Sequence, residues 1–249
     1  MKRIESNKNP QIKQWKKLHT KKERERSGTF MIEGYHLVEE ALKSDVIIRE
    51  LIISETIDIP SKWSVDNLSI TIVTEKIMQE ISDTDTSQGV AAICEQYSAE
   101  EDRHFSKLLL IDAVQDPGNL GTMIRTADAA GIDAVIIGEG SVDVYNSKVV
   151  RSTQGSIFHI PIIKANLQGT IEQLKQSGIK VYGTSLKNAV DYKQAVAQDS
   201  FALLVGNEGN GVDPELLEKT DQNLYIPIYG KSESLNVAVA AGILLYHLR

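Results

Sequence analysis

The chain has 249 residues, of which 41% are hydrophobic and 24% charged. This composition is that of an ordinary soluble globular protein, with room for two modest domains or one large α/β unit. No apolar run approaches the roughly 18 residues of a membrane-spanning helix. The single cysteine, Cys94, excludes an intramolecular disulfide, and the five histidines lack metal-ligand spacing, so we expect no metal site. The first residues lack the apolar core of a secretory signal, which favours a cytoplasmic protein.

The net charge of −7 is distributed unevenly along the chain. Residues 1–26 carry ten Lys/Arg against three Glu, a local +7, which leaves −14 for the rest. This asymmetry favours a basic arm that meets a polyanion such as RNA, although a solvated amphipathic helix accounts for it equally well. Trp15 and Phe30 lie in and beside this segment. They could stack on bases, or they could dock the arm on the body of the protein.

The first half of the chain alternates helix and strand signals. Helical spacing predicts helices at 10–18, which Pro10 opens, and at 35–43 and 75–81. Apolar runs predict strands at 47–53, 70–73 and 90–95. Residues 1–98 are therefore predicted to form a small α/β domain, and the polar residues 99–106 a linker.

A second alternation begins at Lys107. Strands are predicted at 108–114, 134–137, 158–163, 180–183, 201–206 and 223–228. Helices are predicted at 119–130, 147–154, 170–176, 214–218 and 234–248. Short apolar strands between helices predict a mostly parallel sheet covered on both faces, so residues 107–249 are expected to form one α/β domain.

Three strand ends in this second domain have unusual sequences, and ligands bind beyond the carboxyl ends of open parallel sheets. At the first, Asn119 follows Pro117-Gly118 and is predicted to cap the next helix. Arg125 comes six residues later among apolar neighbours. Taken alone, the two residues are consistent with a helix cap and a surface arginine.

The second strand end is glycine-rich, with glycines at 206, 209 and 211. Glycines permit positive φ angles and close approach of the backbone to a ligand. The order Gly-x-x-Gly-x-Gly, its place at the penultimate strand and the missing Walker lysine disfavour a dinucleotide or P-loop site. A structural turn explains the glycines equally well, but it does not explain Glu208 in their midst.

The third strand end, Ile226-Pro227, leads to Ser234-Leu-Asn-Val. Ser234 is predicted to cap the last helix, whose free N–H groups can hold a carboxylate or a phosphate. The small residues that follow allow this helix to pack closely. Packing does not account for the polar segment 232–236.

Together, these segments resemble the SpoU (TrmH-like) branch of the SPOUT RNA methyltransferases. Its Asn-x5-Arg motif matches Asn119 and Arg125, and its Gly-x-Glu-x-x-Gly turn matches residues 206–211. Its Ser-Leu-Asn-Val motif matches 234–237, and its Arg-Ser-x-Gly segment is similar to part of 149–158. The resemblance spans residues 107–249, while 1–97 resemble, less specifically, an L30e-like substrate-binding domain.

The resemblance implies a parallel sheet with a deep trefoil knot that binds S-adenosylmethionine, and it implies no metal. It also implies a homodimer formed through the C-terminal domain, with the active site near the subunit interface. The residues expected around the methyl donor are Thr184, Gly206, Asn207, Gly211, Ile226, Ile228 and Leu235.

The implied reaction transfers a methyl group to a ribose 2′-hydroxyl of RNA. The residues implied in catalysis are Arg125, Asn119, Glu208, Ser234 and Asn236. Arg125 would act as base or as electrostatic stabiliser, and the second role is favoured because a guanidinium keeps its proton. Asn119 and Glu208 would position Arg125 and the substrate. The two remaining side chains would shape the pocket and contact RNA.

Three alternatives to an rRNA methyltransferase stay open at this point. A separate N-terminal domain favours rRNA over tRNA, because a structured, protein-rich target calls for an added docking surface. A tRNA 2′-O-methyltransferase and a catalytically silent L30e-like RNA-binding protein are the main alternatives. A nucleotide-dependent dehydrogenase is disfavoured by the order of the glycines.

Overall fold

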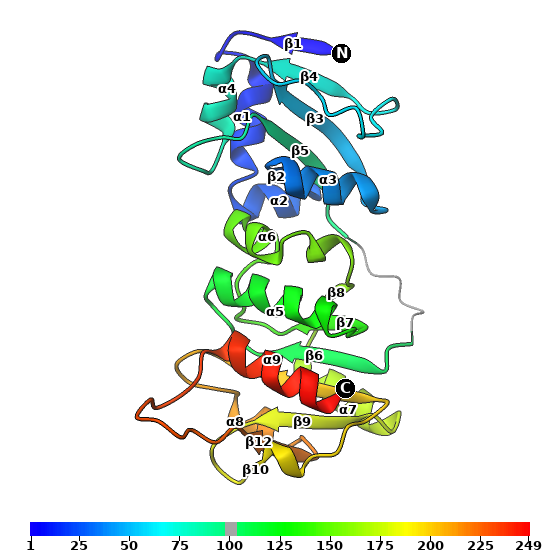
Figure 1. Ribbon diagram of the computed structural model, residues 1–249, viewed down its shortest axis with the longest axis vertical. Helices are drawn as coiled ribbons and strands as arrows, with labels where there is room; N and C mark the ends of the chain where they lie inside the picture. Colours follow the sequence, from blue (N-terminus) through cyan, green and yellow to red (C-terminus); the bar gives the residue numbers. More distant parts are fainter. Residues whose placement is uncertain (98–103) are drawn as a thin grey trace. The chain divides into compact units, whose positions relative to one another are not determined.

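A computed structural model describes residues 1–97 and 104–249 (Figure 1). The chain divides into an N-terminal unit, Met1–Ser98 with Asp143–Phe158, and a C-terminal unit, Ala99–Val142 with His159–Arg249. Of the linker predicted over 99–106, residues 99–103 lie outside the described residues. In the described part of the chain, no helix is both long and apolar enough to cross a membrane.

The N-terminal unit contains a five-stranded mixed sheet in the order β1-β4-β3-β5-β2. Its strands are β1 (Lys2–Ile4), β2 (Thr29–Glu33), β3 (Ile48–Ser54), β4 (Ile70–Val73) and β5 (Val90–Glu95). Strands β1, β4 and β3 pair in parallel, while β5 is antiparallel to both β3 and β2. Its helices are α1 (Pro10–Lys17), α2 (Lys21–Ser27), α3 (Tyr35–Lys43) and α4 (Glu75–Ile81). The predicted small α/β domain is confirmed, but β1, β2 and α2 were not predicted.

The basic segment 1–26 is folded into this unit rather than extended from it. Trp15 is buried, and its indole N–H donates to the Glu50 carboxylate at 3.1 Å. Phe30 is buried in β2, with its ring centroid 4.6 Å from that of Tyr145. The two rings are therefore core residues. Of the two interpretations of Trp15 and Phe30, docking is confirmed and base stacking is wrong.

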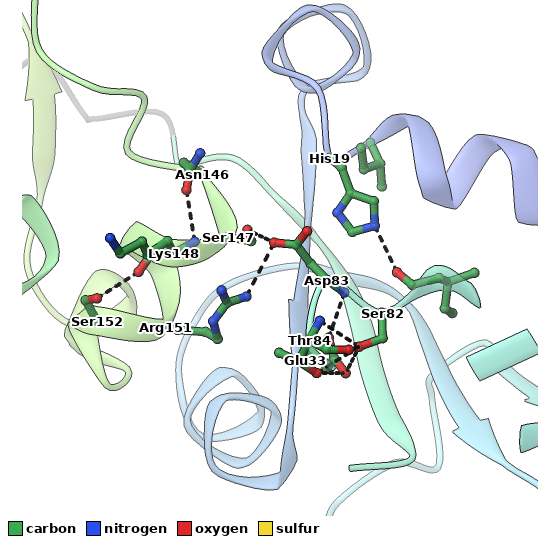
Figure 2. Close-up of polar contacts among 12 residues, drawn as sticks. His19, Glu33, Ser82, Asp83, Thr84, Asn146, Ser147, Lys148, Arg151 and Ser152 are labelled. Carbon is green, nitrogen blue, oxygen red and sulfur yellow. Dashed lines mark hydrogen bonds and ion pairs between the residues drawn. The ribbon is translucent and has the colours of Figure 1, made fainter. Parts of the chain in front are cut away.

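The segment 143–158, predicted within the C-terminal domain, packs in the N-terminal unit instead. It contains α6 (Ser147–Thr153) and a 3-10 turn, Ser156–Phe158. The guanidinium of Arg24, only 4% exposed, donates to Asp143 Oδ2 at 2.6 and 3.0 Å. Figure 2 shows Asp83 accepting from the Ser147 hydroxyl and facing Arg151 at 3.6 Å. Specific polar contacts thus hold the segment in this unit.

The C-terminal unit is built on a seven-stranded sheet in the order β10-β12-β9-β11-β6-β7-β8, and all its pairings are parallel. The strands are β6 (Lys107–Ile111), β7 (Ala134–Ile137), β8 (Ile162–Lys164), β9 (Lys180–Thr184), β10 (Val190–Asp191), β11 (Phe201–Val205) and β12 (Gln222–Tyr225). The predicted parallel sheet is confirmed. The two-residue β10 was missed, because so short a strand has no periodicity to detect.

Helices accompany this sheet as the apolar strands require. They are α5 (Pro117–Ala129), α7 (Leu167–Gln176), α8 (Pro214–Leu217) and α9 (Val237–Leu248). Leu167 and Ile171 of α7 share a buried cluster with strand residues such as Leu204. Helix α9 packs against α5 and β11 and buries Leu244 and Leu245. The turns beyond the carboxyl ends of β6, β11 and β12 remain available for a site.

Candidate active site

The first candidate segment turns sharply between β6 and α5. Ala113 has a φ of 49°, in the left-handed region that a non-glycine residue rarely adopts. The cap of α5 is Asp116, whose Oδ1 accepts the backbone N–H of Asn119 at 2.8 Å. The prediction that Asn119 caps this helix is therefore wrong. Because Asp116 takes that role, the Asn119 amide lies inside the first turn and is free to bond elsewhere.

The second segment is a closed turn. Asn207 and Gly211 exchange two backbone hydrogen bonds of 2.9 Å, and the Asn207 side chain donates to the Ala113 carbonyl at 2.9 Å. A Cβ atom at Gly206 would overlap the backbone of Gly211 and Val212, and Gly211 has a φ of 73°. Glycine is thus required at position 206 because the backbone of the turn, rather than a ligand, lies close to its Cα. The turn is thereby tied to the strand end that precedes α5.

The third segment leads into α9, whose cap is Asn236. Its Oδ1 accepts the backbone N–H groups of Ala238 at 2.9 Å and Val239 at 3.3 Å. The prediction that Ser234 caps this helix is wrong, because the helix begins three residues later, at Val237. Ser234 is exposed, and its carbonyl accepts the Ser232 hydroxyl at 2.8 Å.

One chain of side-chain hydrogen bonds joins all three segments. Asn119 Nδ2 donates to Glu208 Oε1 at 3.0 Å, and Asn236 Nδ2 donates to Asn119 Oδ1 at 2.8 Å. Glu208 also accepts the backbone N–H groups of Asp116 at 3.0 Å and Gln115 at 3.2 Å. Asn119 is separated in the sequence from Glu208 by 89 positions and from Asn236 by 117 positions, yet the three side chains fix one another's orientation.

The Glu208 carboxyl is held in its ionised form. Partial burial raises its pKa, but hydrogen bonds from Asn119 and from the backbone outweigh that effect, and the net pKa lies below its usual value of 4.5. A carboxylate with a lowered pKa is a weak base at neutral pH. Glu208 is therefore suited to positioning donors rather than to accepting a proton.

A cavity of about 700 Å³ lies beside this network. Its volume is in the range of small-molecule sites. All seven residues predicted to surround the methyl donor line it, together with Glu208, Ser234 and Asn236. Within residues 1–97 and 104–249, no three His, Cys, Asp or Glu side chains gather as a metal site would require.

Arg125 is the predicted site residue that the structure does not bring to the cavity. It is exposed on α5, and its side chain makes no hydrogen bond or ion pair with any described residue. Asn119 does not line the cavity either, but its amide bonds two residues that do. The structure therefore assembles the predicted set of residues except for Arg125.

Comparisons with known proteins place this site in a family. The model of the SpoU rRNA Methylase family matches residues 106–246. The chain belongs to the SpoU rRNA methylase family. The MRM3-like substrate binding domain matches residues 9–92 of this SpoU methylase. The predicted family, its methyltransferase class and its N-terminal substrate-binding domain are confirmed, while the roles assigned to single residues remain predictions.

Relatives of this SpoU methylase extend over its full length. The 23S rRNA (guanosine(2553)-2′-O)-methyltransferase RlmP of Bacillus subtilis is 55% identical over 249 residues, covering 100% of both chains. The crystal structure of an AdoMet-bound rRNA methyltransferase from Sinorhizobium meliloti has a TM-score of 0.90 at 36% identity and covers 100% of this chain and 97% of its own. A TrmH/SpoU tRNA modifying enzyme of A. aeolicus, at 32% identity and a TM-score of 0.53, covers 59% of this chain and 76% of its own.

Two residues of the SpoU site, Asp116 and Asp112, were missed by sequence analysis, and so was the structural bond of Asn207, which was predicted only to surround the methyl donor. Asp116 caps α5, Asn207 ties the glycine turn to Ala113, and Asp112 accepts the Asp213 N–H at 2.8 Å. Asp116 directly precedes Pro117, and Asp before a proline at the first helical position is a signature of a helix start that could have identified it. The other two bonds span 94 and 101 residues and have no local signal.

Proposed function

We propose that this chain transfers a methyl group from S-adenosylmethionine to the ribose 2′-hydroxyl of a guanosine in 23S rRNA. The observation that carries the proposal is the Glu208–Asn119–Asn236 chain of hydrogen bonds beside a cavity of about 700 Å³. These hydrogen bonds bring the three family motifs together at one place. The full-length identity to RlmP supports the substrate class.

The cavity fits the donor in size and chemistry. Its lining combines backbone at Gly206 and Gly211 with apolar side chains at Ile226, Ile228 and Leu235. Backbone groups can read an adenine edge, and the apolar side chains can enclose its faces. When bound, S-adenosylmethionine supplies a methyl group that is already strongly electrophilic.

The protein's own task is then to present and activate a poor nucleophile. A ribose hydroxyl must lie in line with the methyl group and lose its proton as the O–CH3 bond forms. We assign Arg125 to stabilising the developing alkoxide, since a guanidinium keeps its proton. Asn119 and Glu208 would position the reacting groups, since the Asn119 amide is held by hydrogen bonds at both its nitrogen and its oxygen. Ser234 and Asn236 would face the RNA.

Ribosomal RNA is favoured over tRNA by the extent of the matches. The S. meliloti rRNA methyltransferase covers 100% of this chain, whereas the A. aeolicus tRNA modifying enzyme covers 59%. The additional length corresponds to a whole domain, consistent with the substrate-binding match over 9–92. A substrate in the ribosome also supports a cytoplasmic location.

We further propose that the C-terminal unit forms a homodimer and that the segment leading to α9 is part of a trefoil knot. Helix α9 leaves Val239 52% and Tyr246 56% exposed, seven residues apart on one side of the helix. A second copy that covers these side chains would also enclose Arg125 on the adjacent α5, which would bring this arginine to a donor cavity. Sedimentation velocity of the wild type and of Val239→Glu tests the dimer, because a monomeric wild type would contradict it.

The decisive experiment uses the purified protein, radiolabelled S-adenosylmethionine and unmodified 23S rRNA. We expect one 2′-O-methylated guanosine, detected as resistance to alkaline cleavage, and no transfer to RNA with a 2′-deoxy nucleotide at that position. Bulk tRNA is the control substrate. Transfer to tRNA alone, methylation on a base, or binding of NAD in place of the donor would each refute the proposal.

A further inference from the structure

Within residues 1–97, the excess of positive over negative charge is confined to the first 26 residues. Residues 27–97 contain four Lys/Arg against thirteen Asp/Glu, a net charge of −9. Such a surface repels a polyanion. Within residues 1–97, the segment 1–26 is therefore the part whose charge can attract RNA.

Half of the basic side chains in residues 1–26 are already neutralised within the unit. Lys16 pairs with Glu80 at 3.0 Å, and Lys2 donates to Gln11. Four others pair with carboxylates, and these are Arg3, Lys21, Arg24 and Arg26. The side chains of the remaining four lysines make no hydrogen bond or ion pair with any described residue, and these are Lys8, Lys13, Lys17 and Lys22.

Three of these lysines gather on one exposed surface. Lys13 and Lys17 are one turn apart on α1, on the side away from the buried Ile12 and Trp15. Lys22 lies in the first turn of α2. Thr20, the cap of α2, accepts the Glu23 N–H at 3.4 Å and donates its hydroxyl to the Lys17 carbonyl at 2.8 Å, so the end of α1 adjoins the first turn of α2.

We infer that Lys13, Lys17 and Lys22 form a docking ridge for the phosphates of the RNA substrate, an inference that rests on the proposed function. The family match over 9–92 includes all three lysines. An anionic membrane is a poorer partner, because insertion requires exposed apolar side chains. Those of the α1–α2 segment, Ile12, Trp15 and Leu18, are all buried.

The test compares three full-length variants in which the same number of lysines is replaced. The first is Lys13→Gln with Lys17→Gln and Lys22→Gln. The matched control, Lys43→Gln with Lys62→Gln and Lys76→Gln, removes the same charge from exposed lysines elsewhere in this domain. The third changes the ridge lysines to arginine, which preserves charge. Each is assayed for the Kd of S-adenosylmethionine and for kcat and the KM of the 23S rRNA substrate at several salt concentrations.

We expect the ridge variant to raise the KM for RNA by about tenfold or more, and to reduce the slope of log KM against log salt by roughly 2 to 3, one counterion per lost phosphate contact. Its kcat and its donor Kd should match the wild type, and the arginine variant should retain the wild-type KM. An equal rise in KM in the ridge and control variants would refute the ridge. A wild type that methylates no RNA would instead refute the proposed function, and wild-type binding to phosphatidylserine vesicles but not to RNA would identify a membrane surface.

Discussion

The N-terminal basic segment and the C-terminal donor cavity show opposite relations between sequence signal and structure. At the cavity, Asn119, Glu208 and Asn236 look like ordinary turn and cap residues, yet they converge in one hydrogen-bonded chain. In the basic segment, a conspicuous run of charge is partly cancelled by carboxylates from other parts of the chain, such as Glu80 and Asp143. A run of charged residues in the sequence thus does not show which side chains are free to bind a ligand, because the carboxylates that pair with them lie far away in the sequence.

The two regions also differ in what their polar contacts do. The pair between Arg24 and Asp143 is almost fully buried, with side chains 4% and 9% exposed, and it holds segment 143–158 in the N-terminal unit. The Glu208 network lies at a solvent-accessible cavity, where it orients groups. The former should therefore control stability and the latter activity.

The largest effect is expected from Arg24→Met. Removing one partner of a buried pair leaves the other charge without its partner and costs about 3–5 kcal/mol. Trp15 and Trp63, the only two tryptophans, both lie in the N-terminal unit, so fluorescence-detected urea unfolding follows this unit alone. The unfolding midpoint should fall sharply, while calorimetric binding of S-adenosylmethionine to the C-terminal unit stays near the wild-type value.

Arg3→Met is the matched control for that measurement. Arg3 is 54% exposed and pairs with the carboxylates of Glu5 and Glu55, and such exposed pairs contribute little to stability. Adding Asp143→Leu to Arg24→Met should restore part of the lost stability, because no unpaired charge then remains buried. Equal losses in the two single variants would mean that the buried pair does not anchor the segment.

Next in size is Arg125→Ala. Removal of one preorganised stabiliser of an oxyanion lowers kcat by about 10²–10³. Because Arg125 does not line the cavity, the Kd of the donor should change less than about twofold, a free-energy difference under roughly 0.5 kcal/mol. Single-turnover methylation and calorimetry on the same preparation test both values. Thr122→Ala, an exposed change one turn earlier on α5, should alter neither, and a loss of donor binding in Arg125→Ala would show that its assigned role is wrong.

The same contrast explains what could be predicted from the sequence. The parallel sheet was predictable because apolar strands between helices are a local signal. The cavity residues were implied by the resemblance to the SpoU family, whose motifs lie at strand ends. The caps were mispredicted, since Asp116 and Asn236 take the places predicted for Asn119 and Ser234. For Asp116 a local signal did exist, because it directly precedes Pro117. Nothing local could show that 143–158 packs in the N-terminal unit, because its anchors Arg24 and Asp83 lie 119 and 64 residues from their partners in the sequence.

A smaller effect is expected from Glu208→Gln, which keeps the shape of the side chain and removes its charge. Losing charge-assisted hydrogen bonds from Asn119 and from two backbone N–H groups should weaken binding of S-adenosylmethionine on the order of tenfold, measured by calorimetry.

The same variant tests the pH dependence of stability. The pKa of Glu208 is lowered by folding, so its stabilising contribution is present above its usual value of 4.5 and is lost as the pH falls through the lowered value. As the pH falls from 5, stability should therefore decrease through a transition that the glutamine variant lacks. Identical pH profiles would mean that the carboxylate does not maintain the network.

The smallest effects separate Asn236 from Ser234. Asn236→Ala removes the cap of α9 and should cost about 1 kcal/mol in thermal unfolding. Asn236→Asp keeps the capping oxygen but loses the Nδ2 donor to Asn119, so it should retain more stability while still impairing methyl transfer. Ser234→Ala, at an exposed position outside the helix, should stay within about 0.5 kcal/mol of the wild type. Its informative value is the KM for RNA: a rise without loss of stability would support a contact with the substrate, and an unchanged KM would remove Ser234 from the site.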